Sequence, residues 1–458
     1  NAKLKVLKGF RDRISTTSYP YRNFYELIAA KSLSDYYQRN SYSIQDTEEK
    51  IDTVDFNFWN KAKFQEEIHT LYRSALEEFE TVDTLKFNQY RELFRQVGSE
   101  EPSGEYVSDY TRQQALNFYF NNLTQADFKN FDWLPAIENY WDAQAFLDLS
   151  IGVTDSEFSK SYGFKRLQTV LTKQKALGNT KRYLHWELYR LKLLKDRSTG
   201  FDAYTEALDK LASGLTNEYK GRVLFAKAEI LNQQGNQYAY LAEDESNRWK
   251  KKEAYVLCEE IIKNAPKSFE AKQAKVLMRI IEQSNLSVRQ ENFILPNSVS
   301  RVLVEFQNHK QIQFAIYKGN WRLIQKVLAE NEDELNLDGL DTIKKWAVDL
   351  PQTTDFQKHA TEVLVDPLAK GQYLLLAYDS AGKNILQKGA FQVTEHSFIE
   401  LPSGQHTEYL ISERRSGKPV VGAQVLLQTK ENNYRNPIYR SITSDSNGRI
   451  RYRARTYH

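Results

Sequence analysis

The spacing of apolar residues changes near residue 287, and this change restricts the chain to a helical part followed by a strand-rich part. In the segment 254–265, apolar residues recur every three or four positions and form one stripe along a helix. Beyond residue 300, apolar and polar residues alternate, as in strands with one buried face. Residues 1–287 hold 10 Gly and 4 Pro, whereas the shorter segment 288–458 holds 9 Gly and 6 Pro. The sequence therefore predicts a multidomain α-then-β fold.

The helical part shows a recurring unit. Helix pairs are predicted to begin near Phe164, Phe201 and Trp249, and a polar insertion, 235–248, lengthens the second interval. Such spacing, with Pro266 between two helices, is typical of tetratricopeptide-like repeats, which we expect over 161–287. An aromatic-rich helical region is predicted over 1–160, with helices at 22–39, 58–81, 84–97, 110–122 and 134–150.

Clusters of large aromatic residues punctuate the first helical region, at 36–37, 118–120 and 140–141. Packing between neighbouring helices is the favoured interpretation, because large aromatic side chains dominate the energetics of cores. An aromatic peptide-binding groove is the functional alternative.

The second part is predicted to contain many short antiparallel strands. The alternating runs 301–306 and 311–316, joined by 307–310, predict a hairpin. Further strands are expected at 345–350, 360–365, 371–379, 384–394, 405–412, 420–428, 437–443 and 449–455, and 321–344 is predicted to be a helix or a loop insertion. This pattern favours two β-sandwiches, over 288–397 and 398–458, that meet near 397–404, the second being incomplete.

Two blocks of the β part resemble the macroglobulin-like domains of bacterial alpha-2-macroglobulins. Tyr409–Val425, which contains Gly417-Lys418-Pro419, and the turn Asp445-Ser-Asn447-Gly448 resemble the second such domain. The blocks 316–318, 346–350 and 368–375 resemble the first. A helical-repeat segment ahead of these domains is similar to the layout of large family members from the Bacteroidota.

The resemblance implies a function for the whole protein, namely a cell-envelope endopeptidase inhibitor that traps proteases, in the periplasm or at the outer membrane. The segment itself is then expected to be a scaffold that binds proteins through its helical repeats. The alternative is a non-inhibitory scaffold subunit of an outer-membrane transport or assembly complex. No transmembrane helix and no nucleic-acid partner is expected, and no apolar signal segment is visible in this sequence. A lipid anchor outside the visible sequence is left open, and further domains are expected beyond His458.

No enzyme is expected, and we predict no catalytic residue, cofactor or metal ligand. The family's thioester needs Cys-x-Glu-Gln, but the chain reads Cys258-Glu-Glu-Ile261, and Ile has no side-chain carbonyl to react. Cys258 also lies on a helical stripe, which indicates a buried thiol. The segment that begins at Asp445 resembles the start of a calcium loop, but it lacks the later ligands of such a loop and is predicted to be a turn.

The seven His, at 69, 185, 309, 359, 396, 406 and 458, do not have the spacing of metal ligands.

Charge is concentrated at the end of the chain. The net charge is +3 overall, while residues 413–458 carry ten Lys or Arg and three Asp or Glu, a net of +7. Arg449, Arg451, Arg453 and Arg455 share one face of a predicted strand, with Ile450 on the other face. A solvated strand face, or one that meets a later domain, is favoured over a nucleic-acid patch.

Overall fold

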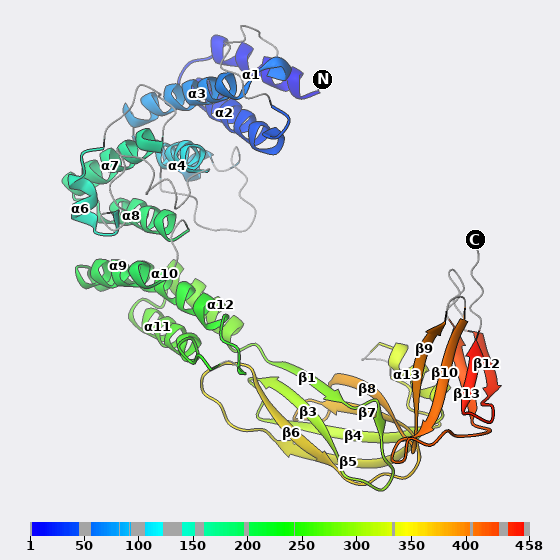
Figure 1. The fold of residues 1–458 in the computed structure, drawn as a ribbon. Coiled ribbons are helices and arrows are strands. Elements are labelled where there is room, and N and C mark those ends of the chain that lie inside the picture. The colour runs from blue at the N-terminus through cyan, green and yellow to red at the C-terminus, as the bar shows by residue number, and fades with distance from the viewer. Residues whose placement is uncertain are drawn as a thin grey trace. The chain divides into compact units, whose positions relative to one another are not determined.

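A computed structural model describes residues 2–44, 56–81, 83–90, 92, 106–121, 140–151, 160–196, 201–241, 243–331, 335–403, 406–429 and 438–452. The chain divides into two compact units, one of residues 1–230 and 260–272 and the other of residues 231–259 and 273–458. Helices occupy the first half of the chain and β-sheets the second (Figure 1). The expected order of α then β structure is therefore present.

The helical half contains helices of six to 21 residues. They are α1 (Ala2–Thr16), α2 (Tyr21–Asn40), α3 (Lys61–Thr81), α4 (Val107–Phe120), α6 (Ala143–Asp148), α7 (Lys160–Ala176), α8 (Thr180–Lys195), α9 (Asp202–Ser213), α10 (Asn217–Gly235), α11 (Lys250–Asn264) and α12 (Phe269–Ile281), with 3-10 turns η1 (Phe56–Phe58) and η2 (Phe87–Tyr90).

Most predicted helices are confirmed, with three differences. Helix α1 was not anticipated. Within the predicted helix 84–97 only the short turn η2 is helical, and residues 91 and 93–97 lie outside the described part. Within 134–150 the helix is restricted to α6, and residues 134–139 lie outside the described part. In the polar insertion 235–248, the described residues after Gly235 are non-helical.

Aromatic side chains form the centre of the first unit, as the core interpretation predicted. Tyr37, Tyr119, Phe120 and Tyr140 are buried in one hydrophobic cluster, against which Tyr36, Phe118 and Trp141 pack. Ring contacts join different helices, for example Phe120 on α4 and Phe164 on α7, whose centroids lie 4.7 Å apart. The close approach of α7 depends on Gly163, because an added Cβ would lie 3.0 Å from Phe120 and Tyr119.

The first β region contains two sheets and one helix. Its elements are β1 (Asn285–Gln290), β2 (Phe293–Ile294), β3 (Ser300–Gln307), β4 (Gln311–Gly319), α13 (Trp321–Ala329), β5 (Asp341–Asp349), β6 (His359–Val365), β7 (Gly371–Tyr378) and β8 (Ile385–Val393). One sheet has the order β2-β8-β7-β4-β5, in which only the short β2–β8 pair is parallel, and the other is antiparallel with the order β1-β3-β6. The segment 321–344, predicted to be a helix or a loop insertion, thus holds both α13 and the start of β5.

These two sheets share a hydrophobic core. Val304 and Phe306 from β3 lie in the same buried cluster as Phe314 and Ile316 from β4. Helix α13 packs on the other face of the five-stranded sheet, where Ile324 joins a separate cluster. Strand β4 contributes to both clusters, because successive residues of a strand point to opposite faces of the sheet. Phe314 and Ile316 face the shared core, and Ala315 and Tyr317 face α13.

The predicted hairpin between 301–306 and 311–316 is wrong. β3 pairs with β1 and β6, whereas β4 pairs with β5 and β7 in the other sheet. The connection crosses from one sheet to the other, and Asn308 adopts a positive φ of 56° within it. Alternation establishes that both strands have a buried face, but two strands that face one another across a core alternate in the same way as two that pair.

Buried polar groups attach residues 235–248 to the first β region within the second unit. Gln357 Nε2 donates to the carbonyl oxygens of Gly235 at 3.0 Å and Arg248 at 3.1 Å. Asp355 accepts from Arg248 Nε at 3.0 Å, and it is buried along with Gln357. These bonds satisfy groups that would be costly to bury alone.

The second β region has five strands: β9 (His396–Ser403), β10 (His406–Glu413), β11 (Gln424–Thr429), β12 (Ile438–Thr443) and β13 (Arg449–Tyr452). They form a sheet of order β13-β10-β9 and a separate pair, β11-β12. β9 occupies the segment where a domain junction was expected. The predicted boundaries at 287 and 397 fall inside β1 and β9, and the four predicted domain ranges stay predictions.

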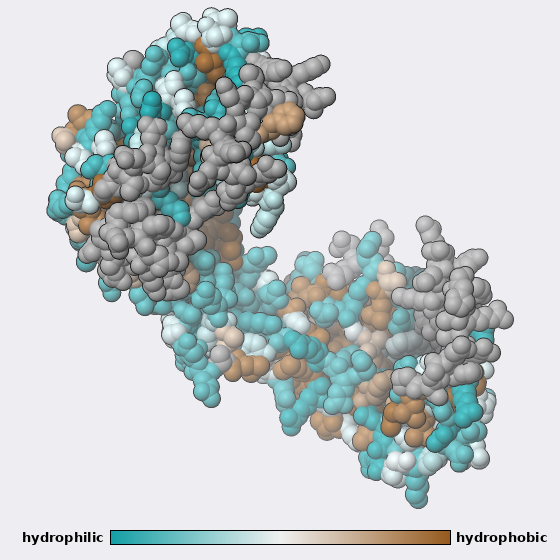
Figure 2. All heavy atoms as spheres, turned by 45° about the horizontal axis from the view of Figure 1, so that its top comes forward, coloured by the Kyte–Doolittle hydropathy of each residue, from teal (hydrophilic) through white to brown (hydrophobic). Residues whose placement is uncertain are grey.

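Apolar patches lie among hydrophilic surface on the β half (Figure 2), with Leu364, Phe398 and Ile399 among the exposed side chains.

Candidate functional site

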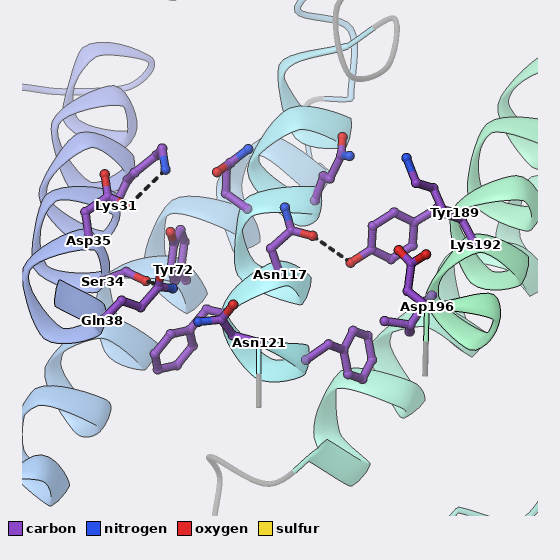
Figure 3. A pocket seen from close by; sticks show the side chains of 15 residues that line it. Lys31, Ser34, Asp35, Gln38, Tyr72, Asn117, Asn121, Tyr189, Lys192 and Asp196 are labelled. Atoms are coloured by element: carbon purple, nitrogen blue, oxygen red, sulfur yellow. Dashed lines mark hydrogen bonds and ion pairs between the residues drawn. The ribbon is translucent and has the colours of Figure 1, made fainter. Parts of the chain in front are cut away.

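A depression of about 420 Å³ opens between three helices of the first unit, α2, α4 and α8 (Figure 3). Helix α4 lies between the other two and forms the floor, while α2 and α8 form the walls. We call this depression the interhelical groove. Its lining residues are Lys31, Ser34, Asp35, Gln38, Tyr72, Gln113, Gln114, Asn117, Phe118, Phe120, Asn121, Tyr189, Lys192, Leu193 and Asp196.

The floor of the groove is rich in side-chain amides. Gln113 and Asn117 on α4 and Asn121 at its C-cap are spaced four residues apart, which places them in one row along the helix. Asn117 Oδ1 accepts a hydrogen bond of 2.9 Å from the Tyr189 hydroxyl on α8. Gln113 Oε1 is shielded from solvent and accepts no hydrogen bond from any residue in the described part of the chain. The floor therefore offers both donors and acceptors to a ligand.

Each wall carries a lysine followed four residues later by an aspartate. On α2, Lys31 Nζ lies 3.2 Å from Asp35 Oδ1, and both side chains are partly exposed. At the end of α8 the corresponding residues are Lys192 and the C-cap residue Asp196, both directed toward the groove (Figure 3). The Asp196 carboxylate lies 2.9 Å from the ammonium of Lys195. The two walls thus present both signs of charge, and the four side chains sum to zero.

Aromatic rings support the groove from below. Tyr72 is buried, and burial together with the negative charge of Asp35 raises the pKa of its hydroxyl well above the ordinary value. Tyr72 is therefore neutral at any physiological pH. Phe118 packs against Tyr72 and Tyr119 with centroid distances of 6.2 Å and 5.5 Å. These ring contacts serve the core, as predicted, while the lining of the groove is mainly polar.

A second depression of about 200 Å³ adjoins the first. Gln38, Phe118 and Asn121 line both depressions, which are therefore neighbours at the end of α4. The other residues of the second depression are Tyr37, Ser41, Gln65, Tyr119 and Lys160. Gln65 Nε2 donates to the Tyr37 hydroxyl at 3.3 Å and adds another amide to the lining.

A buried network of charges fixes the helices around the groove. Arg182 on α8 donates to both carboxylate oxygens of Asp109 on α4, at 2.8 Å each, and to Asp83 at 2.6 Å and 2.8 Å. On the same helix as Asp109, Arg112 donates to Glu80 of α3 at 2.8 Å. Arg182, Asp109 and Arg112 are all buried. The network therefore joins three helices through charge-assisted hydrogen bonds, among which the Arg182–Asp83 pair is bidentate.

The pKa shifts of the network follow from these contacts. Burial by itself would raise the pKa of Asp83, but hydrogen bonds from Arg182 and Ser108 and the charges of Arg182 and Arg112 outweigh it and lower this pKa below the ordinary value. Asp83 and its partner Arg182 are therefore both charged, and their contact is a salt bridge that holds the helices together.

Cys258, the first candidate in the sequence, is a buried free cysteine on α11. Its side chain is inaccessible, and Ala254 and Ile261 of the same stripe are buried as well. This placement confirms the predicted core thiol. No group of three or more His, Cys, Asp or Glu side chains able to hold a metal occurs in the residues that the structure describes. Nor is any helix of that part long and apolar enough to cross a membrane.

The residues that resemble a macroglobulin-like domain come together in the second β region. Ser444 Oγ donates to the Val420 carbonyl at 2.6 Å and accepts from the Ala423 N–H at 2.8 Å. The Ile411 N–H donates to the Gly448 carbonyl at 2.7 Å. Three segments, around residues 411, 420 and 446, therefore meet in one set of hydrogen bonds, which we call the turn cluster.

Asp445 belongs to the turn cluster rather than to a calcium loop. Its Oδ1 accepts from the backbone N–H groups of Asn447 at 2.9 Å and Arg449 at 2.8 Å. These hydrogen bonds lower the pKa of the carboxyl below its ordinary value. The structure confirms the predicted turn, in which the side chain imitates a backbone acceptor.

The basic strand at the end of the chain is only partly described. Arg449 lies 3.3 Å from Glu408 on β10, and Arg451 lies 3.7 Å from the same carboxylate. Ile450 between them is buried, as the alternation predicted. Arg453 and Arg455 lie outside the described residues.

The comparisons with known proteins give weak likenesses. No protein-family model and no curated protein matches the sequence. Among solved structures, a fragment of native alpha-2-macroglobulin from Escherichia coli spanning domains NIE-MG1 is 16% identical, with a TM-score of 0.28 over 37% of this chain and 88% of that one. The fragment spanning MG0-NIE-MG1 is 15% identical, with a TM-score of 0.28 over 37% of this chain and 57% of the other. A CARDB domain from Pyrococcus furiosus in complex with di-metal ions is 12% identical, with a TM-score of 0.15 over 24% of this chain and 86% of that domain.

Proposed function

We propose that this chain is a non-catalytic scaffold and partner-binding segment of a larger cell-envelope protein of the alpha-2-macroglobulin type. The sequence blocks 409–425 and 443–448 are the main support, because they carry the resemblance to a macroglobulin-like domain. The turn cluster supports the proposal further, since it gives those same residues one shared structural role.

The glycines of the blocks illustrate that role. Gly417, Gly422 and Gly448 have φ values of 69°, 73° and 71°, in the left-handed region that favours glycine. At Gly448 an added Cβ would lie only 2.5 Å from the Ile411 carbonyl oxygen. Backbone geometry therefore accounts for the glycines of these sequence blocks, as expected for residues that define a fold rather than a reaction.

The two halves of the chain have different roles in this proposal. Residues 288–397 form a first macroglobulin-like β-sandwich, and residues 398–458 form the start of a second. Residues 161–287 are tetratricopeptide-like repeats that, with residues 1–160, hold protein partners. The interhelical groove, with its mixed charges and amides, is the surface that suits this task.

Covalent capture of a protease does not take place within this segment. A thioester of the family type needs a glutamine three residues after the cysteine, and Ile261 occupies that position after Cys258. Burial of Cys258 also keeps the thiol from attacking a partner. Any trapping by the whole protein therefore depends on enclosure of the protease or on chemistry elsewhere.

Protease retention tests this proposal. The protein isolated from its source is incubated with trypsin, and the mixture is separated by size under native conditions. We expect trypsin to elute with the protein, to hydrolyse a small chromogenic peptide and to lose activity against intact casein. Trypsin that elutes alone with full casein activity contradicts trapping, and stable co-elution with outer-membrane proteins in that case favours the non-inhibitory scaffold.

A further inference from the structure

The spacing of amides in the interhelical groove matches the repeat of an extended polypeptide. An α-helix rises about 1.5 Å per residue, so amides four residues apart are about 6 Å apart along the axis. In an extended chain, every second residue presents its backbone in the same direction, at intervals of about 6.7 Å. The amides of Gln113 and Asn117 on α4 and of Asn121 at its C-cap therefore have the spacing of successive peptide groups of one strand.

Amide side chains suit peptide backbone because each carries an acceptor and a donor, as a peptide group does. Gln113 Oε1 is shielded and has no donor in the described part, whereas Asn117 Oδ1 already accepts from the Tyr189 hydroxyl at 2.9 Å. A buried acceptor that lacks a donor costs free energy until a ligand supplies one. The groove thus has unused hydrogen-bonding capacity in a row about 12 Å long, the length of about four extended residues.

The walls limit the side chains of such a ligand. Lys31 and Asp35 lie on one side of the floor and Lys192 and Asp196 on the other (Figure 3). A strand that lies on α4 places alternate side chains toward opposite walls, because successive side chains point in opposite directions. Each wall offers both signs, so a ligand of mixed charge is matched better than a polyanion such as nucleic acid.

A carbohydrate is a poorer match to this site. Sugars bind best where the face of an aromatic ring is open to them, as bases do on stacking platforms. Most rings of the groove are engaged in the core, with Phe118 against Tyr72 and Tyr119, and Phe120 against Phe164. The remaining ring, Tyr189, is half-buried, with its edge contact to Trp186 at a centroid distance of 5.6 Å and its hydroxyl bonded to Asn117. What remains open is the row of amides and the charged walls.

We propose that the interhelical groove binds an extended polypeptide segment of mixed charge, which α4 recognises through its backbone. This gives the scaffold role proposed above a ligand class, and it rests on that role only for its biological context. Because it concerns the helical half alone, it can be tested on the isolated chain without a protease.

The test begins with the chain of residues 1–458 and a phage library of random 12-residue peptides. Enriched peptides are synthesised with a fluorescent label, and their affinity is measured by fluorescence anisotropy. The test variant is the double substitution Gln113→Ala and Asn121→Ala, which removes the two ends of the row of amides. The control is Gln233→Ala, which removes an exposed helical amide outside the groove. Unfolding in urea checks that the double variant is as stable as the wild type.

We expect enrichment of peptides with both acidic and basic residues, a loss of at least tenfold in affinity for the double variant, and no change for the control. Methylation of alternate backbone nitrogens in the peptide should also lower affinity at least tenfold. Failure to enrich peptides, or equal binding by the double variant, overturns the proposal. So does binding on a glycan array that the double variant abolishes, which assigns the groove to carbohydrate. None of these results bears on protease retention, so the two proposals fail independently.

Discussion

Both carboxylate oxygens of Asp109 on α4 lie 2.8 Å from Nε of Arg182 on α8, in the interior of the helical unit. Asp109 is fully buried and also accepts from the indole N–H of Trp186 at 3.1 Å. This contact joins the floor of the interhelical groove to one of its walls. The geometry of the groove therefore depends on a pair of charges that are far apart in the sequence.

Replacement of Arg182 tests this dependence. Arg182→Met leaves Asp109 and Asp83 without their main cation, and removal of one partner of a buried pair costs about 3–5 kcal/mol. We expect a corresponding loss in the free energy of unfolding, measured in urea by circular dichroism at 222 nm. The matched control is Lys31→Met, which breaks a partly exposed pair worth about 0–1 kcal/mol. Equal effects of the two substitutions would show that the buried network does not stabilise the unit.

His185 gives the helical unit a pH dependence. Burial, with the positive charge of Arg222 as the next cause, lowers the pKa of His185 to about 4. In the unfolded chain the pKa of histidine is about 6.5. Histidine is thus neutral in both states above pH 6.5, and as the pH falls toward about 4 the unfolded state binds the proton first. Stability should fall over this window by at most about 3 kcal/mol.

The measurement is a series of urea unfolding curves between pH 7 and pH 4.5 for the wild type and His185→Leu. The substitution removes this titrating group, so the free energy of the variant should depend less steeply on pH. Parallel profiles for the two proteins would contradict the assignment of the pH dependence to His185.

The turn cluster predicts unequal effects of two glycine substitutions. At Gly448 an added Cβ collides with the Ile411 carbonyl oxygen, whereas at Gly417 no atom lies within 4 Å. Both residues have positive φ, so Gly417→Ala should cost only the backbone strain of about 1–2 kcal/mol. Gly448→Ala should cost several kcal/mol more and should expose the second β region to limited proteolysis. The prediction fails if both variants resist the protease equally.

Cys258 should behave as an inert thiol. Because its side chain is buried, the folded chain should not react with a chromogenic disulfide reagent over minutes, and one thiol per chain should react in 6 M guanidinium chloride, as the sequence contains one Cys. A fast reaction of the native protein would show that the thiol is accessible, against its placement on the buried stripe of α11.

The sequence predicted local structure better than it predicted how elements pair. The helical stripe at 254–265 appears as α11, and the alternating runs after residue 300 appear as β3 and β4. The connection between β3 and β4 was misassigned because alternation reports a buried face and not the partner of a strand. β9 was missed because Phe398, Ile399 and Leu401 are all exposed, and a strand without a buried face has no period-2 signal.

The groove itself could not be predicted from local patterns. Its walls and floor come from helices that begin at residues 21, 107 and 180, and the Arg182–Asp109 contact spans 73 positions. No local period links residues so far apart. The spacing of Gln113, Asn117 and Asn121 was a visible signal, but it does not differ from the polar face of any surface helix until α2 and α8 are in place.

The most direct test of the central proposal, that this chain is part of a larger envelope protein of the alpha-2-macroglobulin type, is to find the native polypeptide. Antibodies raised against residues 1–458 are used to blot the fractionated source cells, and the detected band is sized and identified by mass spectrometry. We predict a polypeptide well above the 53.5 kDa of this chain, in the envelope fraction, with peptides from further macroglobulin-like domains. A band of about 53.5 kDa in the cytosolic fraction would contradict it.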